Sequence, residues 1–541
     1  MTPTRTAVAV DRDAAAVPSV NPATGRAIGA FTPTLCSELP TVLAKSRSAF
    51  EQWSGLSLET RLELFNKAYL EFYAHREELA SLISEETGKP LAEAYSSEIL
   101  PVLDCFKYYG KHARKLLNEQ NIRALNPLLK LRRGYVRYEP LGVVAVISPW
   151  NYPFLLAMQH IVPALLAGNV VIHKPSEYTT LTGLEIREIF DRAYLPRNVL
   201  TVVTGFADVG QALVAAKVDK IFFTGSTSVG RKIYQSAAQN LVPVNMELGG
   251  SDPMIVLEDA YLERAVNGAL WGAFSNAGQT CVSVERLYVH ETIFEPFVEQ
   301  LVQKAHGLRP SRGEQTEGDV ASLNNELQFQ KIQALVKDAA GKGAMVRLGG
   351  NTRPDHTGLY FPPTILTNVD DSMDIARQEV FGPVLSVMPF ASDEEAVALA
   401  NDSEFGLSAT IWTRDLKRGQ RLAARIQSGA VLINEVLAHL AQFEAPYTGY
   451  KSSGLGVSHG PWGMMEMVHP KYISTDRKVM PSLLRFIYKP LAENDVWWFK
   501  YSKRLVQDLK TFILLLHGPS FWTRLRALPA ATKALFRKTY L

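Results

Sequence analysis

Cys281 stands in the stretch "NAGQTCVSVER", residues 276–286, among small and polar neighbours. A lone cysteine is more often a structural residue than a reagent, because free cysteine is among the most buried residue types. Here Gly278 and a polar run precede the thiol, which favours a backbone turn leading into a helix. A helix N-terminus would lower the thiol pKa from its usual value of about 8.5 and supply a thiolate. Cys281 is therefore a candidate nucleophile.

A carboxylate that could serve this thiol is Glu247, in "VNMELGG". It follows an apolar, strand-like run and precedes Gly249 and Gly250, and adjacent glycines allow another group to approach the backbone closely. Taken alone, Glu247 fits a surface acid at a strand end equally well. Beside a nucleophile, it is a candidate general base.

An amide donor follows another apolar run, since Asn151 comes directly after Pro149 and Trp150 in "ISPWNYPF". Proline and asparagine are common in turns, so a loop around a buried tryptophan is the simpler interpretation of this stretch alone. Acyl chemistry, however, requires a preorganised donor for a developing oxyanion, and one such donor contributes roughly 2.7–4 kcal/mol. Asn151 is the candidate for that role.

Phosphate binding is suggested by "KIFFTGSTSVGRKI", in which Gly225 and Gly230 flank a Ser/Thr run between a strand and a helix. Backbone N–H groups at such a helix start can hold a pyrophosphate. The stretch lacks the G-x-G-x-x-G pattern, so an ordinary turn remains the alternative. Lys174 and Glu177 in "IHKPSE" end another strand, where a carboxylate could accept hydrogen bonds from ribose hydroxyls; alone they would be an exposed ion pair of little value.

The elements that must position these groups follow from periodicity. Residues 39–117 carry helical apolar spacing, with Gly88 as a plausible C-cap. Short β-branched runs then alternate with helical patterns, which predicts a parallel, doubly wound sheet. The expected strands lie in "YVRYEPLGVVAVISPW", "GNVVIHKP", "LTVVTG" and "KIFFTG", and then in "DPMIVLED", "RLYVHE", "AMVRLGG", "FPPTILTNV", "VLSVMPF", "SATIWTRD" and "AVLINE".

The length, composition and charge of the chain limit the classes of protein to which it can belong. The 541 residues exceed one ordinary domain, and 47% hydrophobic and 21% charged residues are typical of a globular protein. A net charge of +3 gives no nucleic-acid footprint. Cys36, Cys105 and Cys281 lack metal-ligand spacing, so neither a zinc site nor a disulfide framework is indicated, and a reducing compartment is favoured. Residues 1–20 lack a signal-peptide core, so we expect a cytoplasmic location.

In this order, the motifs resemble those of the aldehyde dehydrogenase superfamily from about Asn21 to Thr475. The matching pieces are "ISPWNYP", "HKPSE", "FTGSTSVG", "MELGGSDP", "NAGQTC", "EVFGP" and "SGLG". The resemblance implies NAD(P)-dependent oxidation of an aldehyde to a carboxylic acid through a thioester on Cys281. Glu247 would activate the hydrolytic water, and Asn151 with the backbone N–H of Cys281 would form the oxyanion hole. The presence of Glu247 favours the hydrolysing type over relatives that acylate coenzyme A.

The resemblance also implies how NAD would be held. Lys174 and Glu177 match contacts to the adenosine ribose, and Glu379 and Phe381 match contacts to the nicotinamide ribose. The expected cofactor residues are Trp150, Lys174, Ser176, Glu177, Gly205, Gly225, Ser226, Gly230, Leu248, Glu379 and Phe381. Glu177 favours NAD because a carboxylate would repel a 2′-phosphate, although NADP stays open.

The implied fold class is α/β, with two doubly wound α/β domains and a small β extension. We expect the following divisions: a leader at 1–20, a dinucleotide-binding domain at 21–246 with its β extension near 130–140, a catalytic domain at 247–445, a return segment with an oligomerisation strand at 446–487, and a basic amphipathic tail at 488–541. The stretches "RRGYVRYEP" and "HPKYISTD" are expected to join protomers into a homodimer or homotetramer.

An apolar substrate is suggested by the helix after the Asn151 motif, "PFLLAMQHIVPALLAG". It lacks the arginine with which relatives acting on succinate semialdehyde often bind the substrate carboxylate. The residues expected to line an apolar funnel are Phe154, Met158, Leu437 and Phe443, with core packing as the alternative. A soluble semialdehyde dehydrogenase remains the alternative function, as does a non-catalytic binding protein with the same fold.

The tail from Tyr488 to Leu541 differs in charge from the rest of the chain. It carries ten Lys/Arg and three Asp/Glu, which leaves 47 basic and 51 acidic residues for the body. A helical stripe is predicted there, formed by Trp498, Tyr501, Leu505, Leu509, Phe512 and Leu516. This pattern fits a helix lying in a membrane interface, peripheral on the inner face. Packing on the protein itself is the alternative. Such a tail would give access to fatty, isoprenoid or apocarotenoid aldehydes.

Overall fold

The structure is a computed structural model that describes residues 16–125, 132–311, 318–351, 358–476 and 503–535. Its internal contacts divide the chain into two compact units. The first comprises Met1–Leu117 with Glu139–His469, and the second comprises Asn118–Tyr138 with Pro470–Leu541. The candidate chemical groups all lie in the first unit, which holds two large sheets.

A six-stranded sheet carries the expected phosphate turn. Its strand order is β17 (Gly454–Leu455), β9 (Val244–Glu247), β8 (Lys220–Thr224), β5 (Val143–Ile147), β6 (Val170–Lys174) and β7 (Leu200–Val202). Five strands run parallel, and only the edge strand β17 pairs antiparallel, with β9. The β-branched runs predicted from the sequence form these strands. Most of their residues are buried, as expected of parallel strands covered on both faces.

Helices connect the strands of this sheet. They are α6 (Leu155–Ala167), α7 (Thr180–Arg192), α8 (Ala207–Ala215) and α9 (Thr227–Ala238), whereas α16 (Gly460–Met465) follows the edge strand β17. Helix α6 is wholly buried and ends at Gly168 in a left-handed conformation, with φ of 100°. This alternation confirms a doubly wound arrangement, in which ligands bind beyond the carboxyl ends of the strands.

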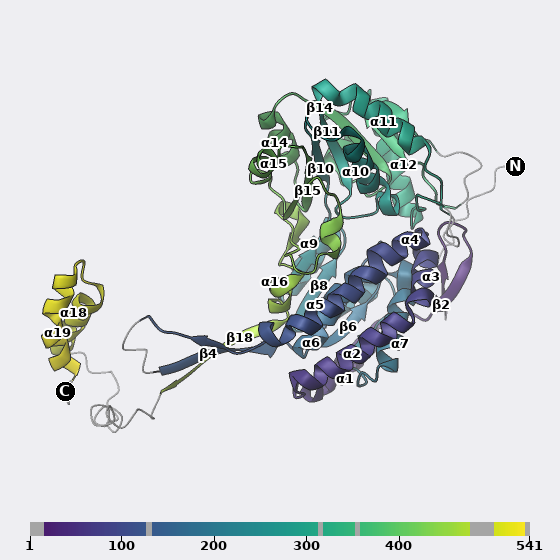
Figure 1. The fold of residues 1–541 in the computed structure, drawn as a ribbon. Helices are drawn as coiled ribbons and strands as arrows, with labels where there is room; N and C mark the ends of the chain where they lie inside the picture. Colours follow the sequence, from purple (N-terminus) through teal and green to yellow (C-terminus); the bar gives the residue numbers. More distant parts are fainter. Residues whose placement is uncertain (1–15, 126–131, 312–317, 352–357, 477–502, 536–541) are drawn as a thin grey trace. The chain divides into compact units, whose positions relative to one another are not determined.

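The N-terminal region begins with a small antiparallel sheet and continues as a layer of helices. The elements are β1 (Val17–Val20), β2 (Ala27–Phe31), α1 (Leu39–Ser54), α2 (Leu58–Ala74), α3 (Arg76–Thr87), α4 (Leu91–Ala94) and α5 (Leu100–Leu116). Gly88 ends α3 with φ of 74°, which confirms the predicted C-cap. Figure 1 shows α2 and α5 beside α6, and Phe72 joins these layers, with ring centroids 5.6 Å from Phe106 and 5.5 Å from Phe154.

The second large sheet has seven strands. Their order is β12 (Met345–Leu348), β13 (Thr364–Thr367), β14 (Val384–Phe390), β11 (Val284–His290), β10 (Asp252–Val256), β15 (Ser408–Trp412) and β16 (Ala430–Ile433). All pairs are parallel except β12 with β13. The seven predicted strands of this region are therefore confirmed, with an antiparallel edge that the sequence pattern did not indicate.

Helices cover both faces of this sheet: α10 (Leu262–Phe274), α11 (Phe294–His306), α12 (Glu326–Gly341), α13 (Asp374–Arg377), α14 (Asp393–Asn401) and α15 (Leu416–Ala423). Two separate apolar cores result. Along β10, Met254 and Val256 belong to the core that includes α10–α12, whereas Ile255 belongs to the core that includes α14 and α15. This is the two-residue alternation of a strand buried on both faces.

The described residues of the second unit form a three-stranded sheet and two helices. The sheet has the order β18 (Val468–Asp476), β4 (Arg132–Pro140) and β3 (Gln120–Ile122). It thus joins the two stretches predicted as the β extension. Gly134 in β4 lies so close to Tyr472 that a Cβ there would sit 2.5 Å from the tyrosine oxygen. The predicted boundaries between domains stay predictions.

The tail forms α18 (Lys503–His517) and α19 (Phe521–Leu535), which pack against each other. Ala527, Ala531 and Ala534 are buried on α19, while Leu505, Phe512 and Leu516 of the predicted stripe are only partly exposed. Trp498 and Tyr501 lie outside the described residues. In the part of the chain that the structure describes, no helix combines the length and apolar character needed to cross a bilayer.

Candidate active site

Cys281 lies in a loop between a helical turn at Ser275–Gly278 and strand β11. Asn276 and Ala277 adopt left-handed backbone conformations, with φ of 51° and 53°, so the loop reverses sharply before the thiol. Gly278 is also left-handed, and a Cβ there would lie 2.1 Å from the carbonyl oxygen of Gly382. The glycine is therefore required by close backbone approach.

The predicted helix after Cys281 is absent, because the chain passes through a turn and enters β11 at Val284. Without a helix N-terminus, the predicted lowering of the thiol pKa is also wrong. The pKa of Cys281 is raised to about 12, chiefly by burial, with a smaller contribution from the nearby carboxylates of Asp252 and Glu247. The hydroxyl of Tyr447, 3.3 Å from Sγ, opposes this rise by hydrogen bonding. The resting group is a thiol, so forming the thiolate requires a proton acceptor.

Asn151 lies between β5 and α6, with its side chain 4% exposed. Its Nδ2 donates a 2.9 Å hydrogen bond to the carbonyl oxygen of Gln279, two residues before Cys281. This bond uses one of the two amide hydrogens and leaves the other available for a developing oxyanion. The hydroxyls of Tyr152 and Thr280, 2.8 Å apart, form a second link between the same segments.

Glu247 ends β9 and is 2% exposed. Its Oε1 accepts a 2.7 Å hydrogen bond from the hydroxyl of Ser458, and its buried Oε2 has no hydrogen-bond partner among the described residues. Burial raises the pKa of this carboxyl to about 8, and the bond from Ser458 partly opposes the rise. A carboxylate with a pKa near working pH can accept and release a proton, which is what a general base requires.

The phosphate turn adjoins this carboxyl. The N–H of Gly225 donates a 3.0 Å hydrogen bond to the carbonyl oxygen of Glu247. Ser226 then caps α9, accepting a hydrogen bond from the N–H of Val229. A Cβ at Gly230 would lie 2.5 Å from Leu248, so this glycine lets α9 pack against the segment after β9. The turn thus presents a helix N-terminus beside the candidate base.

The expected ribose-binding residues lie at the end of β6. Lys174 is 5% exposed and donates from Nζ to the carbonyl oxygen of Pro175 at 3.0 Å. Burial lowers its pKa, whereas the carboxylates of Glu177 and Asp208 raise it. Ser176 caps the short turn Glu177–Thr179 and donates to Glu177 at 3.3 Å. Gly205, predicted with this group, has φ of 132° after β7.

A cleft brings many predicted residues together. Its lining includes these predicted residues: Trp150, Asn151, Gly225, Ser226, Leu248, Cys281, Glu379 and Phe381. Glu247, Lys174, Ser176, Glu177, Gly205 and Gly230 are not part of this lining. The cleft lies beyond the carboxyl ends of β5, β8 and β9, which is the ligand position expected of a doubly wound sheet.

The far wall of this cleft comes from the second sheet. Glu379 accepts a 3.1 Å hydrogen bond from the N–H of Gly250, and burial raises its pKa to about 7. Phe381 has φ of 55°, a conformation held by a 2.8 Å hydrogen bond from its N–H to Glu285. Its ring lies edge-on to Trp150, with centroids 5.5 Å apart. The rings of Trp150 and Phe381 thus form an aromatic wall of the cleft.

Of the four residues expected to line the substrate funnel, Leu437 contacts the group around the thiol, whereas Phe154 packs elsewhere. Leu437 is 8% exposed and packs with Tyr447 and the partly buried Cys281, so it adjoins the thiol. Phe443 is buried against His459, with ring centroids 4.3 Å apart. Phe154 packs on Phe72 in the helical core, which corrects its predicted place in the wall, and Met158 is fully buried.

Several residues at the site had no distinctive sequence signal. Gln328 and Lys331 lie on α12 and line the cleft, where Lys331 donates to the carbonyl oxygen of Glu379 at 2.6 Å. Tyr447 and Ser458 contact the thiol and the base from a late segment of the chain. Each is an ordinary polar residue in its local sequence. In the described residues, no cluster of three metal-ligating side chains occurs.

Comparisons with known proteins agree with this geometry. Residues 9–473 match the model of the aldehyde dehydrogenase family. A 4,4'-diapolycopene aldehyde oxidase of Methylomonas sp is 37% identical over 502 residues, which cover 93% of this chain and 91% of the relative. The peroxisomal aminoaldehyde dehydrogenase 1 of Pisum sativum is 38% identical over 467 residues, or 85% of this chain and 92% of the relative.

Solved structures are similar as well. The NAD+ complex of an aldehyde dehydrogenase from Bacillus cereus is 33% identical, with a TM-score of 0.82 over 86% of this chain and 94% of that one. A betaine aldehyde dehydrogenase from Staphylococcus aureus, a point mutant in complex with NAD+, gives 32% identity and a TM-score of 0.81 over 86% and 95%. The chain therefore belongs to the aldehyde dehydrogenase family.

Proposed function

We propose that this protein is an NAD+-dependent, hydrolysing aldehyde dehydrogenase that acts on an apolar aldehyde at a membrane surface. The observation that carries the chemical part is the hydrogen bond from Asn151 to Gln279, because it holds an amide donor beside the Cys281 loop. A buried carboxyl with a pKa of about 8, Glu247, completes the set.

These residues supply the protein's share of the chemistry. The thiol proton of Cys281 first passes to a base, for which the ionised form of Glu247 is the candidate. Sγ then attacks the carbonyl carbon, and the free amide hydrogen of Asn151 with the backbone N–H of Cys281 holds the resulting oxyanion. After oxidation leaves an acyl group on the sulfur, Glu247, having released the thiol proton to solvent, takes a proton from water, which then attacks the thioester. Base catalysis of this kind contributes roughly 10²–10⁴-fold.

The cleft, together with the turn that follows β6, has the features that a dinucleotide needs. A capped helix start at Ser226 suits a pyrophosphate, and Glu177 at the end of β6 suits ribose hydroxyls. Trp150 and Phe381 supply apolar surface for a flat ring. When bound there, NAD+ would supply the hydride acceptor. Glu177 favours NAD+ because its carboxylate would repel the 2′-phosphate of NADP+.

An apolar substrate is supported by the side chains around the thiol. Leu437 is joined there by the partly buried Val436 and Leu440. Helix α6 carries no arginine that could bind a second carboxylate. The Methylomonas relative, whose name describes oxidation of a diapolycopene aldehyde, aligns with 93% of this chain. We therefore favour long-chain, isoprenoid or apocarotenoid aldehydes.

Membrane binding is assigned to the pair α18–α19. Each helix exposes a row of large apolar side chains: Val506, Leu509, Ile513 and Leu514 on α18, and Phe521, Trp522, Leu525 and Leu528 on α19. Basic residues lie on the same helices, namely Lys503, Arg504, Lys510, Arg524, Arg526 and Lys533. Exposed apolar and aromatic residues combined with cations match an interface bearing anionic lipid.

Turnover of an aldehyde series tests the substrate. Hexanal, decanal, a retinal-like aldehyde and succinate semialdehyde are compared by NADH absorbance, with NAD+ or NADP+. We expect the highest kcat/KM for the long apolar aldehydes with NAD+. A preference for succinate semialdehyde would favour the soluble alternative, and no turnover of any aldehyde would reject the enzyme proposal.

Vesicle flotation tests the surface. The double variant Ile513→Ser, Leu525→Ser should lose binding to phosphatidylglycerol vesicles and lose turnover of decanal presented in them, while hexanal turnover in solution persists. The control Leu241→Ser changes a leucine that is 89% exposed on the first unit and should bind normally. Equal binding of both proteins would reject the membrane assignment.

The three-stranded sheet of the second unit is proposed to form part of a homodimer or homotetramer interface. Tyr472, 60% exposed on β18, is a large apolar side chain at its surface. Light scattering of the purified chain should give a mass of two or four protomers, and a purely monomeric mass would reject the proposal.

A further inference from the structure

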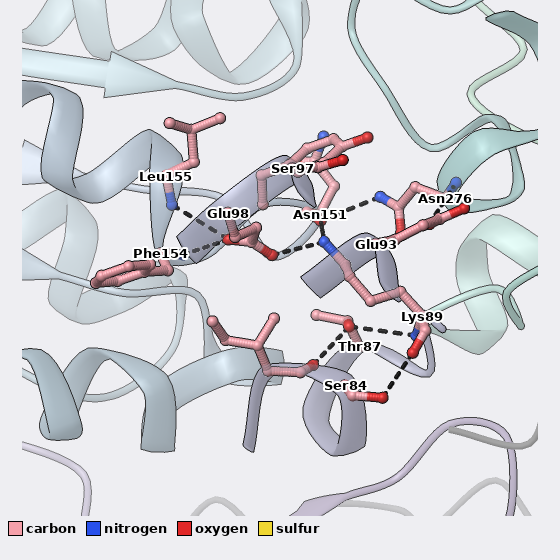
Figure 2. Close-up of polar contacts among 12 residues, drawn as sticks. Ser84, Thr87, Lys89, Glu93, Ser97, Glu98, Asn151, Phe154, Leu155 and Asn276 are labelled. Carbon is pink, nitrogen blue, oxygen red and sulfur yellow. Dashed lines mark hydrogen bonds and ion pairs between the residues drawn. The ribbon is translucent and has the colours of Figure 1, made fainter. Parts of the chain in front are cut away.

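Lys89 is a fully buried cation outside the set of residues described above. It follows Gly88 at the end of α3, and its side chain is 0% exposed. Its Nζ donates to Oε1 of Glu98 at 2.6 Å and to the backbone carbonyl oxygen of Asn151 at 2.8 Å. It also lies 4.1 Å from the ring centroid of Tyr152. Figure 2 shows the ammonium group between the carboxylate and Asn151.

Glu98 is the partner that fixes this cation. It lies in a single π-helical turn, Tyr95–Ile99, and is also fully buried. Its second oxygen, Oε2, accepts hydrogen bonds from the N–H groups of Phe154 at 2.8 Å and Leu155 at 3.1 Å. These groups begin α6, so one carboxylate joins Lys89 to the helix that immediately follows Asn151 (Figure 2).

A second buried carboxylate holds the thiol loop. Glu93 accepts a 2.9 Å hydrogen bond from the N–H of Asn276. The amide of Asn276 donates at 3.1 Å to the carbonyl oxygens of both Asn151 and Gln279. The carbonyl of Asn151 therefore accepts from Lys89 and Asn276 together. These hydrogen bonds hold Asn276 in its left-handed conformation, with φ of 51°.

A buried ion pair is weak evidence of stability, because desolvation of both charges opposes their attraction. The specific effect of this pair is on geometry, since it fixes the backbone from which the amide of Asn151 projects. We infer that Lys89, paired with Glu98, is a positioning residue that aims the Asn151 amide at the oxyanion formed on Cys281. This inference rests on the proposed function, in which Asn151 stabilises that oxyanion.

The consequence is a loss of rate rather than of binding. Without the ammonium group, the carbonyl of Asn151 keeps only the bond from Asn276, and the amide can tilt away from the thiol. A displacement of about 1 Å in a catalytic group can cost roughly 100-fold in rate. We expect Lys89→Met to lower kcat by about 10- to 100-fold, with the KM for NAD+ changed less than about twofold.

Arg61, which contacts the C-terminal end of α6, offers a matched control variant. Arg61 is also a buried cation that donates to backbone carbonyl oxygens, those of Leu166 and Leu56. Leu166 lies near the C-terminal end of α6, remote in sequence from Asn151. Arg61 lies on α2, so Arg61→Met removes a buried cation that contacts the end of α6 without removing any donor to Asn151. It should change stability but leave the aim of the amide unchanged.

The test is a double-mutant cycle with Asn151→Ala on the full-length chain. If Lys89 acts through the amide, kcat of Lys89→Met with Asn151→Ala should equal that of Asn151→Ala alone. Arg61→Met should instead change kcat by the same factor in both backgrounds. Acylation of Cys281 by 4-nitrophenyl acetate, which needs no NAD+, is measured in parallel and should show the same non-additivity.

Independent effects of Lys89→Met and Asn151→Ala would overturn the inference, as would an equal loss of kcat in Arg61→Met. If Lys89→Met does not fold, Glu93→Ala replaces it, since that variant frees Asn276 and should also be non-additive with Asn151→Ala. Failure of the proposed function has a different result, because the unaltered protein would then oxidise no aldehyde in the series.

Discussion

Ser458 and Glu247 are joined by a 2.7 Å hydrogen bond from hydroxyl to carboxyl, although they lie 211 positions apart in the chain. The other carboxyl oxygen of Glu247 is buried without a partner among the described residues. Burial therefore dominates, and the pKa of the carboxyl rises to about 8. The hydroxyl of Ser458 is the contact that opposes this effect of burial on the candidate base.

Ser458→Ala should move the pH dependence of thioester hydrolysis to higher pH. The hydroxyl stabilises the carboxylate form, so its removal raises the pKa of Glu247 further. A hydrogen bond to a charged group contributes roughly 1.5 kcal/mol, which corresponds to a shift of about one pH unit. The pH profile of single-turnover deacylation measures this. Ser452→Ala is the control, because Ser452 contacts Arg231 rather than the base; identical profiles for all three proteins would contradict the prediction.

Glu247→Gln should stabilise the fold, increasingly so as pH rises from 5 to 8.5. The carboxyl loses its proton near its ordinary pKa of 4.5 when unfolded but near 8 when folded. Between these values the folded chain holds a proton that the unfolded chain has lost, so this group makes stability fall with rising pH. Glutamine removes that dependence and keeps an acceptor for Ser458. Urea midpoints at several pH values measure the gain, with exposed Glu435→Gln as control; a gain that does not grow with pH would argue against a raised pKa.

Tyr447→Phe should slow alkylation of Cys281 by iodoacetamide several-fold at pH 8, in the manner expected when the thiolate fraction falls. The tyrosine hydroxyl, 3.3 Å from Sγ, is the contact that lowers the thiol pKa against the effect of burial. Mass spectrometry of the labelled peptide follows the rate. Tyr109→Phe, which removes another buried hydroxyl from the first unit, should alkylate normally. An unchanged rate in Tyr447→Phe would mean that the hydroxyl does not stabilise the thiolate.

Asn151→Ala should lower kcat roughly 10²–10³-fold, the usual effect of removing an oxyanion donor. Binding of NAD+, followed by quenching of tryptophan fluorescence, should persist because the backbone of the cleft remains. Asn169→Ala provides the comparison, since that buried amide donates to the carbonyl oxygens of Ala164 and Met467. A comparable loss of kcat in both variants would indicate general damage to the fold instead of loss of the donor.

Much of the architecture could be predicted because it follows from local patterns. Buried β-branched runs bounded by glycine and proline predicted the strands of both large sheets. Along β10, successive side chains alternate between two apolar cores, so a strand buried on both faces is apolar along its whole length. The antiparallel direction of the edge strand β12 and the short antiparallel strand β17 were not predicted, since the direction of a strand depends on its neighbours rather than on its own residues.

Candidate site residues could also be selected from local patterns, but the environment of each side chain could not be predicted from them. Cys281 stood out as a thiol among small and polar residues, yet the pattern suggested a following helix and a lowered pKa, whereas the structure has a turn and a pKa raised to about 12. Phe154 fitted an apolar wall by its position in the chain, but its ring points into the helical core. Burial of a side chain is a property of the packed molecule and is only loosely fixed by its neighbours in sequence.

By itself, the sequence determined the kinds of groups available and the order of strands and helices that carry them, because hydrophobic period, turn residues and motifs are local. Only the tertiary structure decided which groups meet. It placed Ser458 on Glu247, Tyr447 on Cys281 and Lys89 on Asn151, across separations of 211, 166 and 62 positions. Such contacts set the pKa values and the aim of the donors, since electrostatics and hydrogen bonding act through space and leave no trace in local sequence.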